Sequence, residues 1–271
     1  MAFVTYLINK IYNDYGDQEL FFNKSVLHVT GLEPKKVFLK VKNEQWPCVL
    51  YSCSMKFARI IMSLDADAFE FLKSVNNFVN LRFSFFREES KKSVMFYVPA
   101  NIDGYRNLNE KYKNVYLVNL NFTQKPSEDL IEILGAVIEA NKNFEKRGDT
   151  RISLNDRIAK DIGFESTNII AEIDMIRRSC ILRNLSTAGA SILLQCMPKL
   201  LIGKKILLHL KRADSKDAIN LKGKLNRFDK VEGRRDIYEL GIQFNQKDIP
   251  LEFKKILNEY YKKLESMAKN K

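Results

Sequence analysis

Two blocks of short β-forming runs, separated by one amphipathic helix, constrain the fold of this 271-residue chain most strongly. The runs are rich in β-branched and aromatic residues, and breaks with Gly, Pro or Asn separate them, as at residues 31–34 and 101–104. The front block has its runs at residues 37–41, 48–51, 79–86, 94–98 and 115–122, with a helix expected over 65–74. The back block has them at residues 180–182, 190–194, 205–210, 219–225 and 237–244. This pattern predicts a mainly β chain with helices, an α+β fold of two small β-barrel domains.

The helix between the two blocks is expected over about residues 128–145. Pro126 and Ser127 precede it, and Glu128 and Asp129 give it an acidic first turn that suits the helix dipole. Its apolar face comprises Leu130, Leu134, Val137 and Ile138. We therefore expect an N-terminal domain over 1–126, a semi-rigid helical linker over 127–145 and a C-terminal domain over 146–271.

The end of the chain also has the pattern of an amphipathic helix, and its lysines lie opposite the apolar stripe. The stripe consists of Phe253, Ile256, Leu257, Tyr260, Tyr261, Leu264 and Met267. We expect it to pack on the barrel of its own domain rather than on a partner. Residues 152–178 have no pattern that separates helix from strand.

The positive charge is concentrated in the back half of the chain. The net charge is +12 overall. Residues 1–140 hold 17 Lys and Arg against 16 Asp and Glu, whereas residues 141–271 hold 28 against 17. An anionic partner is therefore expected to bind the back half.

The cysteines indicate a reducing compartment, and the start of the chain gives no sign of export. Cys48, Cys53, Cys180 and Cys196 show no CxxC spacing, so we interpret them as reduced core thiols of a cytoplasmic protein. The first residues lack a basic segment followed by an apolar one, and no uncharged apolar window reaches membrane-spanning length. Neither a secretory signal nor a membrane span is expected.

Two short motifs carry chemistry suited to a phosphorylated purine. Arg147 and Arg151 form an RxxxR pair directly after the expected linker helix. An arginine guanidinium can bind a phosphate through two hydrogen bonds and can also stack on a guanine ring. Downstream, the segment from Asn184 through Ser186 to Gly189 reads NxSxxG. It offers an amide for a base edge, a hydroxyl for a phosphate oxygen and a glycine that permits close backbone approach.

These motifs, in this order, resemble the signature of PilZ domains, which are bacterial receptors for cyclic di-GMP. The apolar run at 190–194 and the closing segment 238–244, with the helix after it, extend the resemblance over about residues 141–271. By this resemblance, Arg147 and Arg151 clamp guanine faces and phosphates, and Asn184 reads a guanine edge. Ser186 and Gly189 complete the floor of the site. Lys146 stands where many members have another arginine, and it could neutralise phosphate charge.

The front half, which has neither motif, resembles by architecture the N-terminal partner domain of two-domain PilZ proteins, including the flagellar-brake type. The resemblance implies a receptor without metal or cofactor that changes its interdomain arrangement when cyclic di-GMP binds. Its output would reach a protein partner in motility, adhesion or envelope regulation. The chain has no HExxH, GxSxG or Walker-type motif, which disfavours an enzyme.

Two alternatives to a receptor remain at this point. The basic half could track the phosphates of a nucleic acid, which predicts dispersed lysine contacts and steep salt dependence. The barrel could instead be a scaffold that binds no nucleotide and mediates protein contacts only.

Overall fold

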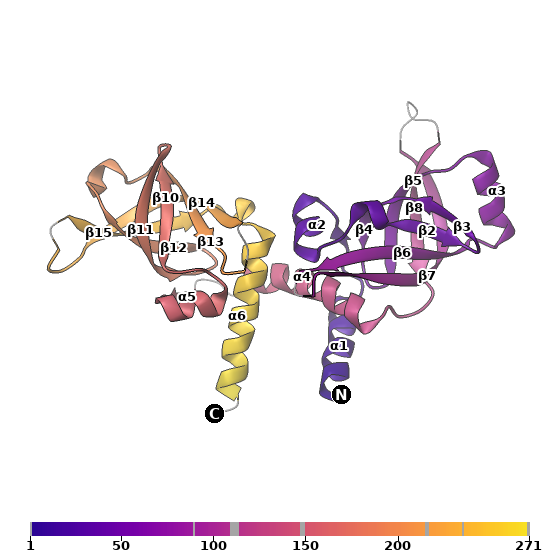
Figure 1. The fold of residues 1–271 in the computed structure, drawn as a ribbon, viewed down its shortest axis with the longest axis horizontal. Helices are drawn as coiled ribbons and strands as arrows, with labels where there is room; N and C mark the ends of the chain where they lie inside the picture. The colour runs from indigo at the N-terminus through magenta and orange to yellow at the C-terminus, as the bar shows by residue number, and fades with distance from the viewer. Residues whose placement is uncertain are drawn as a thin grey trace. The chain divides into compact units, whose positions relative to one another are not determined.

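A computed structural model describes residues 2–88, 90–108, 114–146, 150–214, 217–234 and 236–269. The chain divides into two compact units, Met1–Glu139 and Ala140–Lys271, and the division falls within one helix, α4 (Glu128–Lys146) (Figure 1). This helix was expected at 128–145. None of the described helices is long and apolar enough to cross a membrane.

The N-terminal unit is built on an eight-stranded antiparallel sheet with the strand order β1-β4-β5-β8-β7-β6-β2-β3. Its strands are β1 (Leu20–Phe21), β2 (Phe38–Val41), β3 (Glu44–Pro47), β4 (Val49–Cys53), β5 (Phe57–Ser63), β6 (Phe78–Arg87), β7 (Lys92–Asn107) and β8 (Val115–Phe122). The helices are α1 (Ala2–Tyr15), α2 (Lys24–Thr30) and α3 (Ala66–Ser74), with a 3-10 turn at Pro34–Lys36. All five strands expected from the sequence are present.

Two features of this unit differ from the sequence prediction. The turn expected at 101–104 is wrong, because β7 continues through these residues with a bulge between Ile102 and Gly104. Helices α1 and α2 were not expected. Helix α1 packs closely on α4, since a Cβ on Gly135 would lie 2.4 Å from Cγ2 of Ile11. Tertiary packing of this kind stabilises helices that have weak local signals.

The C-terminal unit contains a closed six-stranded antiparallel barrel. Its strands follow the order β10-β13-β14-β15-β12-β11, and a further β10–β11 ladder closes the ring. They are β10 (Asn168–Ile173), β11 (Ile176–Leu185), β12 (Gly189–Gln195), β13 (Lys205–Lys211), β14 (Ala218–Lys230) and β15 (Ile237–Phe244). The strand β9 (Ile152–Ser153) pairs with β11 outside the ring. The mainly β fold with a barrel and helices is thus confirmed.

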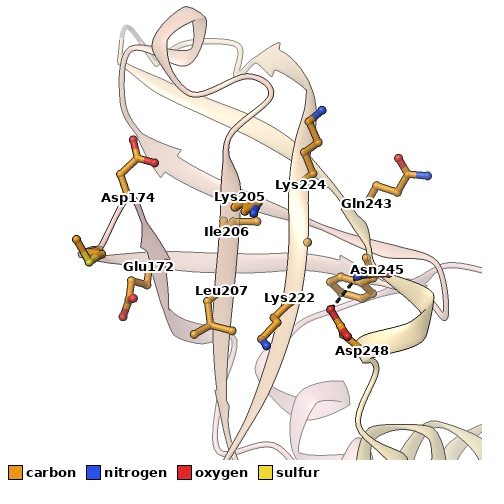
Figure 2. A pocket seen from close by; sticks show the side chains of 13 residues that line it. Glu172, Asp174, Lys205, Ile206, Leu207, Lys222, Lys224, Gln243, Asn245 and Asp248 are labelled. Carbon is orange, nitrogen blue, oxygen red and sulfur yellow. Dashed lines mark hydrogen bonds between the residues drawn. The ribbon is translucent and has the colours of Figure 1, made fainter.

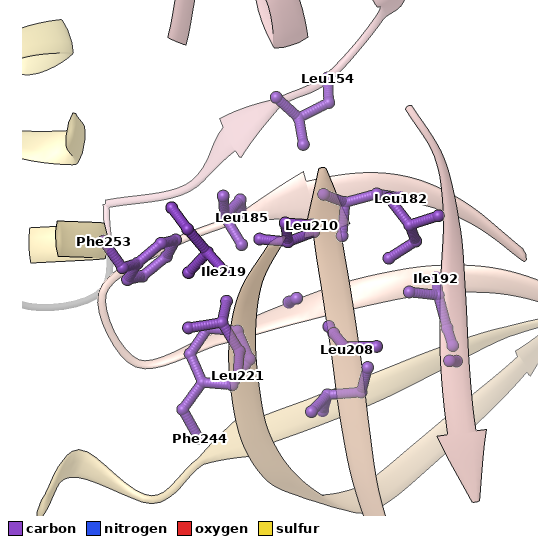
Figure 3. Packing of buried hydrophobic residues seen from close by; sticks show 14 of the residues in the cluster. Leu154, Leu182, Leu185, Ile192, Leu208, Leu210, Ile219, Leu221, Phe244 and Phe253 are labelled. Atoms are coloured by element: carbon purple, nitrogen blue, oxygen red, sulfur yellow. The ribbon is translucent and has the colours of Figure 1, made fainter. Parts of the chain in front are cut away.

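Alternate residues of the barrel strands point inward and form one apolar core. Figure 3 shows part of this core, in which Leu208, Leu221 and Ile192 of three strands meet; each is at most 1% exposed. Phe253 reaches the same core from helix α6 (Leu251–Lys269) and is fully buried. Every barrel strand contributes residues to this core, so the outer surface alone remains for a ligand.

Helix α6 packs on its own barrel, but only through its first part. Leu257, Tyr260 and Tyr261 belong to the barrel core. Leu264 and Met267 are 42% and 52% exposed, so the expectation that the whole stripe packs is wrong for these two residues. An ion pair of 3.7 Å between Lys263 and Asp161 also joins α6 to the helix α5 (Asp156–Ile162).

The segment 152–178, which the sequence left unassigned, contains β9, the helix α5 (Asp156–Ile162), β10 and the start of β11. The side chain of Asn155 accepts a hydrogen bond from the N–H of Ile158 and caps α5. Gly163 ends the helix with φ of 106°, a conformation that favours glycine. These elements account for the long separation between the two motifs.

Candidate functional site

Of the RxxxR pair, the structure describes Arg151, whereas Arg147 lies outside the described residues. Lys146 is the last residue of α4. Arg151 directly precedes β9, whose Ile152 pairs with Leu185 and thereby brings Arg151 next to the second motif. A hydrogen bond of 2.8 Å from the hydroxyl of Tyr261 to the carbonyl oxygen of Thr150 holds this segment on α6. Two anchors thus fix the backbone beside Arg151.

Asn184 lies near the end of β11, just after a bulge between Leu182 and Asn184. It stands opposite Ser153 of β9 on one side and opposite Ser191 of β12 on the other. Ser191 in turn stands opposite Gly241 of β15, and Gly241 stands opposite Arg227 of β14. These paired residues form a row that crosses four strands from Asn184 to Arg227. Since Ile192 and Leu240 point into the core, their neighbours Ser191 and Gly241 face outward.

Ser186 organises the turn that follows β11. Its hydroxyl oxygen accepts hydrogen bonds from the N–H groups of Ala188, at 3.3 Å, and Gly189, at 3.1 Å. Its hydroxyl lies 3.2 Å from the carbonyl oxygen of Gly189 and donates to it, and the side chain is almost fully buried. The motif serine therefore shapes the floor of the site by fixing the backbone of its own turn.

Gly189 permits a close approach between β12 and β15. A Cβ at this position would lie 2.2 Å from the carbonyl oxygen of Ile242, well inside van der Waals contact. Only glycine fits here without a backbone shift. The glycine of the motif is thus required by the packing of the barrel beneath the site.

The two motifs meet at one hollow of about 250 Å³ on the outer face of the barrel. Arg151, Asn184 and Gly189 line it together, whereas Ser186 is not among its lining residues. Three polar residues that the sequence did not single out complete it, namely Asn226, Arg227 and Gln243. The sequence does not mark them as site residues, because they belong to no motif. They lie within or beside strands that were recognised only by the pattern of their apolar residues.

Arg227 reaches the hollow because of two local features of the sheet. A bulge in β14 between Leu225 and Arg227 accommodates the extra residue Asn226. The side chain of Arg227 then lies across Gly241, where a Cβ would stand 2.5 Å from Cγ of Arg227. A larger residue at position 241 would displace the arginine.

The hollow is electrostatically suited to an anion. Two arginines line it, and no carboxylate is among its lining residues. Within the part of the chain that the structure describes, the side chains of Asn184, Asn226 and Arg227 make no hydrogen bond or ion pair, so they can bind a ligand. Such a hollow on a closed barrel is suited to a ligand that carries phosphate groups, for example a nucleotide.

Comparisons with known proteins define the family. A family model described as a PilZN3 domain matches residues 6–141, and one described as a PilZ domain matches residues 145–263. A cyclic di-GMP binding protein of Treponema denticola is 36% identical over 254 residues, which are 94% of this chain and 81% of that protein. The chain therefore belongs to the PilZ family, with a PilZN3 domain followed by a PilZ domain, and this confirms the resemblance found in the sequence. Its relatives are binding proteins and not enzymes.

Two solved structures are also similar to the chain. The PlzA protein of Borreliella burgdorferi, solved in complex with c-di-GMP, is 18% identical, with a TM-score of 0.43 over 95% of this chain and 99% of that one. YcgR of Escherichia coli, solved in complex with c-di-GMP, is 11% identical, with a TM-score of 0.30 over 98% of this chain and 93% of that one.

Proposed function

We propose that this protein is a receptor for cyclic di-GMP and binds it at the hollow that Arg151, Asn184 and Gly189 line. The observation that carries the proposal is the convergence of two motifs, distant in sequence, on one anion-suited hollow of the barrel surface. The name of the Treponema denticola relative supports the choice of ligand.

In this proposal each residue has a separate role. The guanidinium of Arg151 binds a phosphate and stacks on a guanine face, and Arg147 is assigned the same role by resemblance. Asn184 hydrogen-bonds a guanine edge, while Ser186 and Gly189 form the floor beneath the ligand. Lys146 contributes positive charge.

Arg227 is a further ligand contact in this proposal, on the side of the hollow opposite the motif segment. It stands across the row of paired strands from Asn184, and the intervening residues, Ser191 and Gly241, are small. A flat ligand can therefore lie over them and reach a guanidinium at one end and an amide at the other.

The response to the ligand is proposed to be a change in the arrangement of the two units. Arg147 and Arg151 follow α4, the helix through which the chain passes from one unit to the next. A ligand that binds one arrangement more tightly shifts the population towards it. The new surface would act on a protein partner in motility, adhesion or envelope regulation.

Calorimetric titration of cyclic di-GMP into the full chain tests the site, with GTP as the control nucleotide. Each charge-assisted hydrogen bond contributes about 1.5–3 kcal/mol, so Arg151→Ala and Arg227→Ala should each weaken binding roughly 10- to 100-fold. Arg157→Ala is the matched control, because Arg157 is an exposed arginine of α5 that does not line the hollow. Its affinity should equal that of the wild type.

Other outcomes would replace the proposal by an alternative. A folded wild-type chain that gives neither heat nor a shift in melting temperature with cyclic di-GMP is a scaffold. Binding to a single-stranded oligonucleotide with steep salt dependence, and no response to cyclic di-GMP, would instead assign the basic half to nucleic acid.

A further inference from the structure

A second and larger groove, of about 810 Å³, lies on the outer face of the barrel over β10, β13, β14 and β15. Figure 2 shows that Lys205, Lys222 and Lys224 lie on two adjacent strands within it. The groove borders the hollow described above, because Gln243 lines both. Neither sequence motif contributes a residue to this groove.

The three lysines form an uncompensated cluster of positive charge. Lys205 of β13 and Lys224 of β14 stand directly opposite one another in the antiparallel ladder. Lys222 lies two residues from Lys224 and therefore on the same outward face. Like charges that are directly opposed on neighbouring strands destabilise a sheet. An anion bound between them would remove this repulsion.

The carboxylates of the groove do not supply that anion. The Asp174 carboxylate pairs with Lys204, and the Glu172 carboxylate lies 3.3 Å from the guanidinium of Arg177. The side chain of Asp248 accepts a hydrogen bond of 2.7 Å from the side-chain amide of Asn245. Within the described ranges, by contrast, Lys205, Lys222 and Lys224 make no hydrogen bond or ion pair through their side chains.

The lining indicates which class of anion fits. Lysine ammonium groups bind phosphate oxygens as point charges, and the lining holds no arginine for planar, bidentate recognition. Phe244, its one aromatic residue, is 4% exposed, so it offers no ring face on which a base could stack. The groove is therefore suited to recognising phosphate charge rather than a base.

The size of the anion is limited by the carboxylates at the margins. In Figure 2 Glu172 and Asp174 lie on one side of the lysines and Asp248 on the other. Asp248, whose partner Asn245 is neutral, would repel a phosphate chain that extended past it. On the side of Glu172 and Asp174, the cations Arg177 and Lys204 are already paired, so they offer a longer chain no further charge. From these observations we infer that the groove binds a compact di- or polyphosphate group, at a site separate from the hollow proposed for cyclic di-GMP.

The test is a calorimetric titration of pyrophosphate into the full chain at low salt, without and with saturating cyclic di-GMP. The wild type should bind one pyrophosphate, and the double variant Lys205→Gln/Lys224→Gln should bind pyrophosphate with an affinity at least tenfold lower. Lys230→Gln is the matched control, because Lys230 is exposed on β14, makes no side-chain interaction among the described residues and does not line the groove. An ADP titration shows whether the group is recognised alone or as the tail of a nucleotide.

The integrity of the variants and the separateness of the two sites are checked alongside. Because the substitutions remove a like-charge contact, the melting temperature of Lys205→Gln/Lys224→Gln should equal or exceed that of the wild type. Lys222→Gln provides a second variant, and it should also weaken pyrophosphate binding. Arg151→Ala should leave pyrophosphate binding within twofold of the wild type, whatever its effect on cyclic di-GMP.

Three results would overturn the inference: no pyrophosphate binding by the wild type, undiminished binding by Lys205→Gln/Lys224→Gln, or an equal loss in Lys230→Gln. Tighter binding of a single-stranded oligonucleotide through the same lysines would also overturn it, because the ligand would then be a polymer. None of these results bears on whether cyclic di-GMP binds at Arg151.

Discussion

Replacing Gly189 by alanine should force apart the paired strands β12 and β15. The added Cβ would lie 2.2 Å from the carbonyl oxygen of Ile242, whereas carbon–oxygen contacts in sheets are about 3.3 Å or longer. The two strands must therefore separate by about 1 Å at this end. The obstructing atom belongs to the backbone of a paired strand, so no side-chain rotation can relieve the contact.

The expected loss of stability follows from that displacement. Overpacking in a well-packed region costs about 1–3 kcal/mol, and weakening one ladder hydrogen bond adds about 1 kcal/mol. We expect Gly189→Ala to lower the free energy of unfolding of the C-terminal unit by about 3 kcal/mol. For a unit of this size, Ala140–Lys271, that is a fall in melting temperature of about 10 °C.

Thermal unfolding followed by calorimetry or circular dichroism measures this effect. Gly104→Ala is the matched control: the nearest atom to its added Cβ would be Nδ2 of Asn119 at 3.8 Å, an ordinary contact. That variant should melt within about 2 °C of the wild type. A fall of less than about 3 °C for Gly189→Ala would refute the argument that packing requires the motif glycine.

Three further predictions concern single side chains. Hydrogen bonds from Lys36, Ser84 and Ser93 lower the pKa of Glu33 from 4.5 to about 2, so its contribution to stability is present above pH 4.5 and is lost as the pH falls towards 2. Urea unfolding of Glu33→Gln should show a deficit of about 1 kcal/mol at pH 7, since the Glu33–Lys36 pair is partly exposed, and only a small part of that deficit at pH 2. Tyr261→Phe, which loses the bond to the Thr150 carbonyl, should cost about 1 kcal/mol in the same assay and weaken cyclic di-GMP binding about threefold by calorimetry. Arg212→Ala should lower the stability of the C-terminal unit by about 2 kcal/mol in thermal melts, because Arg212 is 16% exposed and pairs with carboxylates of the β13–β14 loop and α6.

Most of the barrel could be predicted from the sequence because its inward positions alternate with outward ones. The runs at 205–210 and 237–244 coincide with β13 and β15 almost residue for residue. The prediction failed where a local signal and the tertiary structure disagree. The sequence around Gly104 predicted a turn, yet this residue lies at a bulge of the continuous strand β7. Helix α1 was missed because packing on α4, which no local pattern shows, supports it.

The site was predictable in part, for a related reason. Asn184 and Gly189 stand in a short motif whose chemistry can be recognised locally, and Arg151 could be placed by its order relative to that motif. Arg227 and Gln243 could not, because they enter the hollow through strand register. The bulge at Asn226 determines which residues of β14 face the hollow, and a one-residue shift would turn Arg227 to the opposite face.

Strand register and small side chains together keep the surface between Asn184 and Arg227 clear of bulky groups. Ser191 and Gly241 occupy the two central places of the row from Asn184 to Arg227, and neither projects a bulky side chain. Ser191 is 1% exposed, and within the described residues its hydroxyl has no hydrogen-bond partner. A buried hydroxyl without a partner is costly, and Ser191 is not among the residues that line the hollow, so a ligand in the hollow does not account for this hydroxyl. The row from Asn184 to Arg227 therefore serves the proposed ligand through the small size of its central residues and not through a hydrogen bond from Ser191.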